Sequence, residues 1–151
     1  MKLMTTSQAG RDLIKKYEGL RLKAYKCPAG VWTVGYGHTR GVTSSTEISQ
    51  SMADLFLLDD IRPLERYINK LGINFRQGQF DALVSFMFNL GEGNFNKSTL
   101  KKKILAGGND EDIAAEFKKW NKAGGKVLDG LTKRREEEAE LWLREKDARI
   151  K

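Results

Sequence analysis

The sequence is short of the residues that hold small proteins together covalently or through metals. Its 151 residues include one cysteine, one histidine and two prolines. A single cysteine cannot form a disulfide within the chain, and one cysteine with one histidine cannot build a structural zinc site. We therefore expect no metal and no cofactor, and a fold that depends on the packing of its core.

Long apolar runs are also missing. No stretch reaches the about 18 apolar residues that a membrane-spanning helix requires. The N-terminal stretch MKLMTTSQAGRDLIKKYEG lacks the apolar run of a secretory signal. We expect no signal peptide, no signal-anchor segment, no membrane insertion, and accumulation in the cytoplasm. Neither an internal repeat nor a Pro/Ser-rich linker divides the chain, so a single domain is predicted over residues 1–151.

Positive charge is the clearest compositional excess. The net charge is +7 and the sequence pI is about 9.5. Such a surface attracts polyanions, including nucleic acid, anionic lipid and acidic cell-wall polymers, and the charge alone does not choose among them.

The N-terminal third of the chain predicts a short helix followed by a small sheet. Ser7 is a typical helix cap and Gly19 a typical stop. Glu18 falls at the end of this helix, where a negative charge opposes the macrodipole. The pieces RLKAY and WTVGYG, joined by the turn-forming KCPAG, predict a twisted hairpin or a three-stranded sheet within residues 22–36.

The rest of the sequence has helical periodicity. Ser49 caps a long predicted helix, which Pro63 is expected to kink or break. A second helix, over residues 77–90, carries an apolar face broad enough for the centre of a core. Gly, Asn and Asp punctuate the remaining segments, and the predicted fold class is α+β, mostly α. The apolar positions of the long helix are Met52, Leu55, Phe56, Leu58 and Ile61; those of the second are Phe80, Leu83, Val84, Met87 and Phe88; further helices are predicted over 97–106, 110–121 and 131–146.

The glycine-rich stretch that holds Cys27 and His38 is open to three chemical interpretations. A nucleotide-binding loop fails, because the spacing is not GxGxxG and no phosphate-binding lysine follows. A nucleophilic Cys27–His38 pair is possible, but it lacks an obvious orienting partner. A carboxylate that acts on a sugar fits better. Glu18 precedes Cys27 by nine positions and Thr33 by fifteen, so a helix end and two strands can present an acid and two water-holding groups.

Three blocks of the sequence resemble one family. EGLRLKAYKCPAGVWTVGYGH, which starts at Glu18, resembles the active-site segment of the phage lysozymes, the endolysins of glycoside hydrolase family 24. QFDALVSFMFNLG resembles the central helix of that family, and STL from Ser98 follows it. WNKAGGKVLDGLTKRREEE resembles its C-terminal part. The blocks agree with the family in order and spacing, so the resemblance covers most of the chain.

The resemblance implies a lysozyme-like fold and a muramidase. A β-containing lobe of about residues 18–60 and a helical lobe of about 1–17 and 61–151 are expected to flank a cleft. The substrate would be the β-1,4 bond between N-acetylmuramic acid and N-acetylglucosamine in peptidoglycan. Glu18 would be the general acid, with Cys27 and Thr33 ordering the attacking water for inversion. Cys27 stands where many members have Asp, so a covalent role or a packing role for its thiol stays open.

Further residues are expected to border the substrate. The resemblance places Phe88, Asn89 and Ser98 along the sugar groove. Gly37 is expected to allow close backbone approach beside the cleft. His38 is also a candidate for the substrate side, although we favour a structural tie to an acid such as Asp59. Arg134 or Arg135 could meet peptide carboxylates.

The family resemblance also implies how the protein is used. We expect a monomer that acts on peptidoglycan during host lysis, released from the host cytoplasm to the periplasm and cell wall by a holin-type permeabilising protein. A lytic transglycosylase on the same substrate is the alternative within enzymes. A basic nucleic-acid-binding module is a third possibility, but no aromatic platform or recognition helix accompanies the basic clusters, so no specific nucleic acid is expected.

Overall fold

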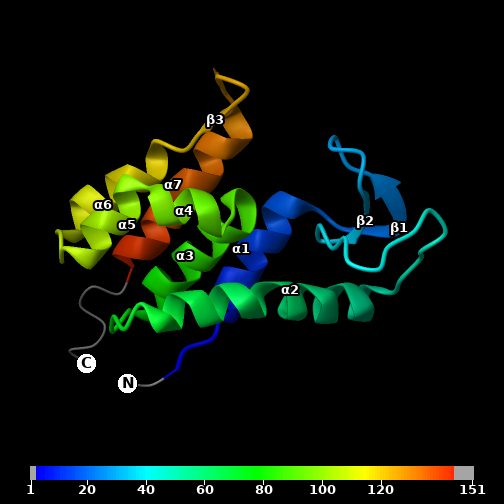
Figure 1. Cartoon of the computed structure of the whole chain (residues 1–151), viewed down its shortest axis with the longest axis horizontal. Helices are drawn as coiled ribbons and strands as arrows, with labels where there is room; N and C mark the ends of the chain where they lie inside the picture. The colour runs from blue at the N-terminus through cyan, green and yellow to red at the C-terminus, as the bar shows by residue number, and fades with distance from the viewer. Residues whose placement is uncertain (1–2, 145–151) are drawn as a thin grey trace. The chain divides into compact units, whose positions relative to one another are not determined.

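The computed structural model describes residues 3–144, and the elements are labelled in chain order in Figure 1. The chain divides into two compact units. One, here called the helical unit, consists of Met1–Leu13 and Leu64–Lys151. The other, here called the β unit, is Ile14–Pro63. The observed elements confirm the predicted fold class, which is mostly helical with a small antiparallel sheet.

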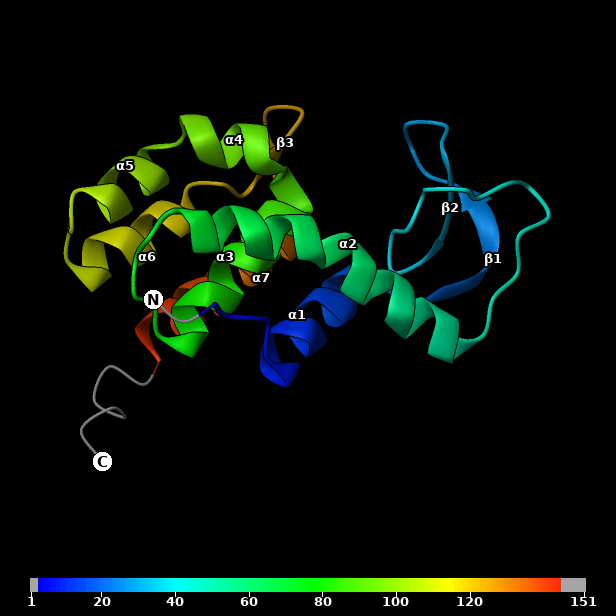
Figure 2. The same ribbon diagram turned by 60° about the horizontal axis from the view of Figure 1, so that its bottom comes forward.

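The β unit is built on a two-stranded antiparallel hairpin. Strand β1 (Arg21–Lys26) pairs with β2 (Trp32–Gly35), with Tyr25 opposite Thr33. The connection that follows β2 turns back along β1. Ala24 N donates to Thr46 O at 2.9 Å, and Ile48 N donates to Leu22 O at 2.9 Å. Figure 2 shows this long connection beside the two strands, where it supplies an irregular third edge in place of a regular strand.

Helix α1 (Gln8–Glu18) begins and ends as predicted. Gly10 N donates to the Ser7 hydroxyl at 3.4 Å, so Ser7 caps the helix. Gly19, with φ of 74°, follows its last residue.

Helix α2 (Gln50–Lys70) differs from the prediction in two respects. It continues through Pro63, which lies on an exposed side of the helix, so the predicted break does not occur. Pro63 has no N–H, so the Asp59 carbonyl lacks its helical hydrogen bond. Asp59 is also exposed, and water can donate to this carbonyl instead. Met52 and Leu55 are 40% and 55% exposed, so they were wrongly assigned to the apolar side. The buried stripe repeats every four residues in its first half and consists of Ala53, Leu57, Ile61 and Ile68.

The core of the helical unit is α3 (Gln77–Leu90), whose predicted bounds are confirmed. The predicted apolar positions Phe80, Leu83, Val84 and Met87 are buried. Helix α7 (Asp129–Leu143) packs against α3 and against α6 (Asp110–Lys118). The approach of α3 to α7 is close at Gly78, where a side chain would collide with the Leu141 carbonyl.

Two short helices connect α3 to α6. The predicted helix over residues 97–106 corresponds to α5 (Thr99–Leu105), and α4 (Glu92–Lys97) before it was not predicted. Ser98 separates the two helices, and its hydroxyl accepts from Lys101 N at 3.0 Å and so caps α5. Asn109 caps α6 in the same way through Asp112 N, at 2.8 Å.

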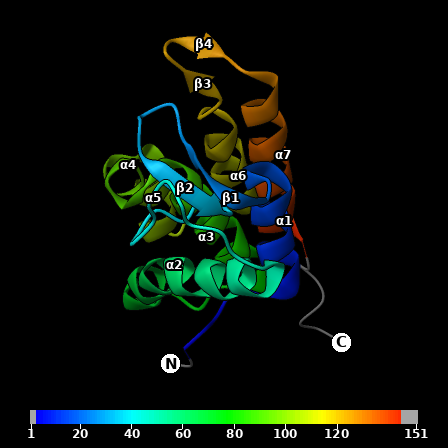
Figure 3. The same ribbon diagram turned by 90° about the vertical axis from the view of Figure 1, so that its right-hand side faces the viewer.

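A second hairpin was not predicted. Strands β3 (Lys122–Ala123) and β4 (Lys126–Val127) pair between α6 and α7, and Figure 3 shows them at the ends of these two helices. Gly124 and Gly125 both have positive φ, 58° and 81°, which suits a two-residue hairpin turn. The helix predicted over 110–121 ends earlier, at Lys118, and the hairpin follows it. The next predicted helix, 131–146, begins earlier, at Asp129, and its positions 145 and 146 lie outside the described residues.

A buried charged cluster joins α7 to α3. Glu138 is fully buried and lies between Arg134 and Arg135, with Nε of Arg135 at 2.9 Å from Oε1 of Glu138. Ser85 of α3 donates its hydroxyl to Oε2 of Glu138. Burial raises the pKa of Glu138 to about 7, against the opposing charges of Arg135 and Arg134.

Replacing Glu138 with glutamine is expected to change how stability depends on pH. The pKa of Glu138 rises from 4.5 to about 7 on folding, so its ionisation works against folding between these values. Relative to Glu138→Gln, the wild type is therefore most stable below pH 4.5. It should lose about 3 kcal/mol of that advantage as the pH rises through about 7. Urea unfolding across this range measures the difference.

The matched control is Glu140→Gln, an exposed position on the same helix. Its difference from the wild type should stay nearly constant over the same pH range. A Glu138→Gln difference that is equally flat would contradict the prediction.

Candidate active site

Glu18 lies against the turn that follows β2. It is the last residue of α1 and is half-buried. A Cβ atom at position 37 would lie 3.5 Å from Oε1 of Glu18, so the carboxylate is next to the Gly37 backbone. Gly37 has φ of 89°, a conformation that favours glycine. Gly37 therefore allows the close backbone approach that the sequence predicted.

The turn that carries Gly37 is closed by two backbone hydrogen bonds. Val34 N donates to His38 O, and His38 N donates to Val34 O, both at 2.9 Å. The turn thus holds the Gly37 backbone directly beyond the end of β2, next to the Glu18 carboxylate.

Cys27 and Thr33 form a second pair within the β unit. Cys27 N donates to Val31 O at 3.0 Å, and the half-buried thiol sits in the resulting turn between β1 and β2. Hydrogen bonds from the Val31 and Ala29 backbone lower the pKa of the Cys27 thiol. The Thr33 side chain adds a smaller effect in the same direction. The structure therefore brings together two of the three predicted catalytic side chains.

The hydroxyl of Thr33 is buried and donates to Val31 O at 2.9 Å. The Thr33 side chain also lowers the pKa of the neighbouring Cys27 thiol. A hydroxyl carries one proton, so Thr33 can donate to the carbonyl or to a thiolate, but not to both. When it donates to the carbonyl, its lone pairs are available to a proton donor such as water.

The two pairs lie near one another along the same strand. Thr33 precedes Gly35 by two residues, a step of about 7 Å in a strand, and the turn with Gly37 follows directly. Glu18, at the end of α1, thus lies against the turn that directly follows β2, and β2 carries Thr33. This arrangement can combine proton donation by one group with water activation by another.

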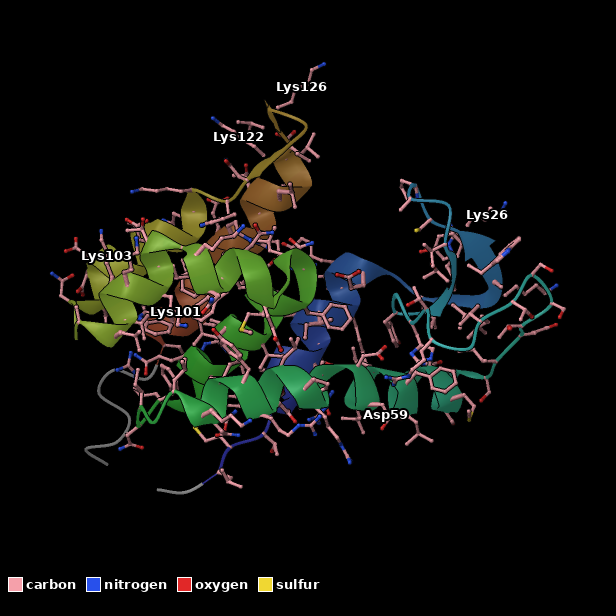
Figure 4. All side chains as sticks on the ribbon, viewed as in Figure 1. Lys26, Asp59, Lys101, Lys103, Lys122 and Lys126 are labelled. Carbon is pink, nitrogen blue, oxygen red and sulfur yellow. The ribbon has the colours of Figure 1, made fainter. Side chains whose placement is uncertain are left out.

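His38 is buried and ties the turn to α2. It is 6% exposed, and its Nδ1 lies 2.9 Å from Oδ2 of Asp60. Its ring stacks on Phe56 at 4.2 Å. The acid is thus Asp60 and not Asp59, which is exposed on α2 and is labelled in Figure 4. Helical periodicity explains the difference, because neighbouring helix positions point about 100° apart.

The other predicted substrate residues belong to the helical unit. Phe88 and Asn89 are half-buried in the last turn of α3. Asn89 Oδ1 accepts from Nη2 of Arg135 at 2.8 Å. Ser98 is buried, and its hydroxyl donates to Phe95 O at 2.6 Å while it caps α5. Contact between these residues and a substrate stays a prediction.

Arg134 and Arg135 do not extend to the surface as the sequence suggested. Both are buried and face Glu138 and Ser85. The spacing of Arg135 and Glu138, three positions apart on one helix, was a signal for this pairing that could have been read from the sequence. Nothing local to the sequence pointed to Ser85 or Asn89 as their partners.

The described part of the chain contains neither a cluster of metal-binding side chains nor a membrane-spanning helix. Between residues 3 and 144, no group of three or more His, Cys, Asp or Glu side chains is arranged to hold a metal ion. In the same range, no helix combines the length and apolar character needed to cross a membrane.

Alkylation of the only cysteine should report the lowered pKa. Iodoacetamide reacts with the thiolate, so the midpoint of its rate against pH is expected below 9.0. Thr33→Val removes the hydroxyl that lowers the pKa of the thiol and should move the midpoint upward. Mass spectrometry of the modified protein measures the rate. A wild-type midpoint at or above 9.0, or an unmoved midpoint in the variant, would contradict the described geometry.

Comparison with known proteins places these residues in a family context. The profile of the family described as phage lysozyme matches residues 15–138. An endolysin of Acyrthosiphon pisum secondary endosymbiont phage 1 is 45% identical over 144 residues, which cover 92% of this chain and 98% of that protein. An endolysin of Bacillus phage B103 is 47% identical, over 93% of this chain and 54% of its own length. The chain thus spans about half of the latter protein.

One further relative carries the name SAR-endolysin, and another has a solved structure. A protein of Bacteriophage PS119, named SAR-endolysin, is 34% identical over 93% of this chain and 83% of its own length. The muramidase domain of SpmX from Asticaccaulis excentricus superposes with a TM-score of 0.85 at 36% identity. That match covers 92% of this chain and 97% of the domain.

Proposed function

The chain belongs to the phage lysozyme family, and we infer that it is a phage endolysin, a glycoside hydrolase that degrades bacterial peptidoglycan. We propose that it cleaves the β-1,4 bond between N-acetylmuramic acid and N-acetylglucosamine. The observation that carries this proposal is the hairpin of the β unit. There Glu18 lies against Gly37, and Cys27 lies beside Thr33.

Glu18 is proposed as the general acid. It donates a proton to the glycosidic oxygen as the bond to the anomeric carbon breaks, which turns a poor leaving group into an alcohol. The neighbouring Gly37 leaves room for the carboxyl group and the sugar oxygen, since no side chain projects from position 37.

Cys27 and Thr33 are proposed to activate the water. A lone pair of the Thr33 hydroxyl accepts a hydrogen bond from one O–H of the water, while that hydroxyl donates to Val31 O. The Cys27 thiolate, favoured by the Val31 and Ala29 hydrogen bonds, removes the proton of the second O–H as the water oxygen attacks the anomeric carbon, and the first O–H stays in the product. Attack from the face opposite the leaving group inverts the configuration.

The remaining predicted residues are given supporting roles in the proposal. His38, buried against Asp60 and Phe56, positions the turn that carries Gly37. Phe88, Asn89 and Ser98 are proposed to border the sugar groove, by resemblance to the family.

The cellular setting is also proposed from the family resemblance. The protein would act as a monomer and accumulate in the host cytoplasm. A holin-type permeabilising protein would then give it access to the periplasm and the cell wall. Because some relatives are named SAR-endolysins, expression with and without a permeabilising protein separates this route from independent export.

Lysines on the second hairpin are suited to attract an anionic wall. Lys122 and Lys126 are exposed, and Figure 4 shows both on the β3–β4 hairpin. Among the described residues, no carboxylate forms an ion pair with either. Lys103, in contrast, is bound to Glu116 at 2.8 Å. The carboxylates of peptidoglycan stem peptides carry the opposite charge and would be attracted to these lysines.

Glu18→Gln is expected to lower kcat at least about a hundredfold, because the amide cannot donate the required proton. Release of reducing ends from purified peptidoglycan measures kcat, and circular dichroism checks the fold. Glu47→Gln, an exposed position in the same unit, is the matched control. A fully active, folded Glu18→Gln would end the assignment.

The anomer of the first product identifies the mechanism. Inversion releases an α-anomer, as expected if Cys27 and Thr33 activate water. A retained β-anomer would assign Cys27 a covalent role, and a 1,6-anhydro product would identify a lytic transglycosylase. Either result would overturn the proposed water activation while leaving Glu18 as the acid.

Neutralising the hairpin lysines should weaken binding to the wall. Lys122→Gln with Lys126→Gln is expected to raise KM about three- to tenfold at low salt, with kcat unchanged. The difference should disappear near 1 M salt, where screening is strong. Lys97→Gln with Lys102→Gln removes the same charge from exposed positions elsewhere and is the control. An equal rise in KM for both pairs of substitutions would show that net charge, and not the position of the lysines on the hairpin, causes the effect.

A further inference from the structure

Lys15 of α1 contacts two other parts of the β unit. Its Nζ lies 3.0 Å from Oδ1 of Asp54, on α2. The same ammonium group lies 5.4 Å from the centroid of the Tyr36 ring, in the turn that follows β2. All three residues belong to Ile14–Pro63. One side chain thus joins α1, α2 and the turn through an ion pair and a cation–π contact.

These contacts lie in a partly buried setting. The Lys15 side chain is 25% exposed, and Tyr36 is buried. Oδ1 of Asp54 is itself buried, and within residues 3–144 the Lys15 ammonium is the group that pairs with it. Lys15 therefore compensates the charge on a carboxylate oxygen that water does not reach. Solvent and salt screen such a pair less than a pair on the open surface.

Lys15 begins the last turn of the helix that ends at Glu18. Its carbonyl accepts from Gly19 N at 3.0 Å, which closes that turn. Residues three positions apart are neighbours on a helix surface, so the Lys15 anchor acts on the segment that presents the Glu18 carboxylate. This carboxylate lies against Gly37, and Lys15 contacts Tyr36, the residue before it. The helix end and the turn are thus in contact at two adjacent points.

We propose that Lys15 is a positioning residue that holds the Glu18 carboxyl group in place for proton donation, through its contacts with Asp54 and Tyr36. This inference rests on the proposed function, because it concerns the general acid of that reaction. The last turn of a helix frays unless other contacts hold it. A misplacement of about 1 Å at a reacting group can lower the rate about a hundredfold. The anchor therefore acts on kcat, and Lys15 itself takes no part in the bond cleavage.

Lys15→Met tests the role, because methionine keeps a long side chain and removes the charge. Reducing-end release from purified peptidoglycan gives kcat and KM for the full chain. We expect kcat to fall about tenfold or more, because Glu18 is no longer held in one position. KM should stay unchanged, because Lys15 binds no sugar. A contact that only stabilises the unit would lower the midpoint of urea unfolding and leave kcat of the folded protein unchanged.

Two further variants at the same helix end control for charge. Lys16 is exposed in the same turn and lies two positions before Glu18. Lys16→Met removes the same charge near the acid and should keep the wild-type kcat. Lys15→Arg keeps a cation that can pair with Asp54 and stack on Tyr36, so it should restore kcat. An equal loss of kcat in Lys16→Met and Lys15→Met would show a general effect of charge and would overturn the inference.

Asp54→Asn tests the partner of Lys15. This change removes the acid and keeps the shape of the side chain, so kcat should fall with KM unchanged. In the Lys15→Met background, Asp54→Asn should cause no further loss of kcat, because the ion pair is already absent. Losses that simply multiply in the double variant would contradict the proposed pairing. Circular dichroism checks folding, and Asp54→Asn keeps the test decisive if Lys15→Met does not fold.

The outcomes separate this inference from the proposed function. Suppose that the wild type cleaves peptidoglycan and Glu18→Gln does not. A wild-type kcat in folded Lys15→Met or folded Asp54→Asn would then overturn this inference alone. A fully active Glu18→Gln, or a folded wild type that does not cleave peptidoglycan, would overturn the proposed function and this inference with it.

Discussion

The burial of Glu138 between two arginines is the constraint on which the helical unit depends. A carboxyl group removed from water is unfavourable unless charges and hydrogen-bond donors surround it. Arg134, Arg135 and the Ser85 hydroxyl supply them, and Ser85 belongs to α3. The requirement fixes α7 against α3 in one register. The same two helices approach closely at Gly78, where a side chain would collide with the Leu141 carbonyl.

The sequence predicted elements with strong local signals and missed those set by distant contacts. The bounds of α3 followed from five apolar positions at helical spacing, with Gly91 as a stop. The β3–β4 hairpin was missed because strands of two residues carry no period. Its signal is the Gly124–Gly125 pair, which equally fits the punctuation between two helices. Along α2, the prediction gave weight to large side chains and overlooked the small, buried Ala53.

At the candidate site, residue identity was more predictable than residue partnership. Family spacing singled out Glu18, Cys27 and Thr33, and the structure brings the last two into contact. The sequence alone could not choose between Asp59 and Asp60 as the partner of His38, because the direction of each side chain depends on how α2 faces the turn. The link from Arg135 to Asn89 joins residues 46 positions apart. No local pattern encodes such a contact, since only the packing of α7 on α3 creates it.

The tip of the second hairpin has a practical consequence for handling the molecule. Gly124 and Gly125 are exposed, and a side-chain carbon built at either position meets no atom within 4 Å. Strands β3 and β4 pair with each other through their backbones, so residues can be inserted at the tip without disturbing a core residue. This tip is therefore a natural point to insert an affinity peptide between the two glycines.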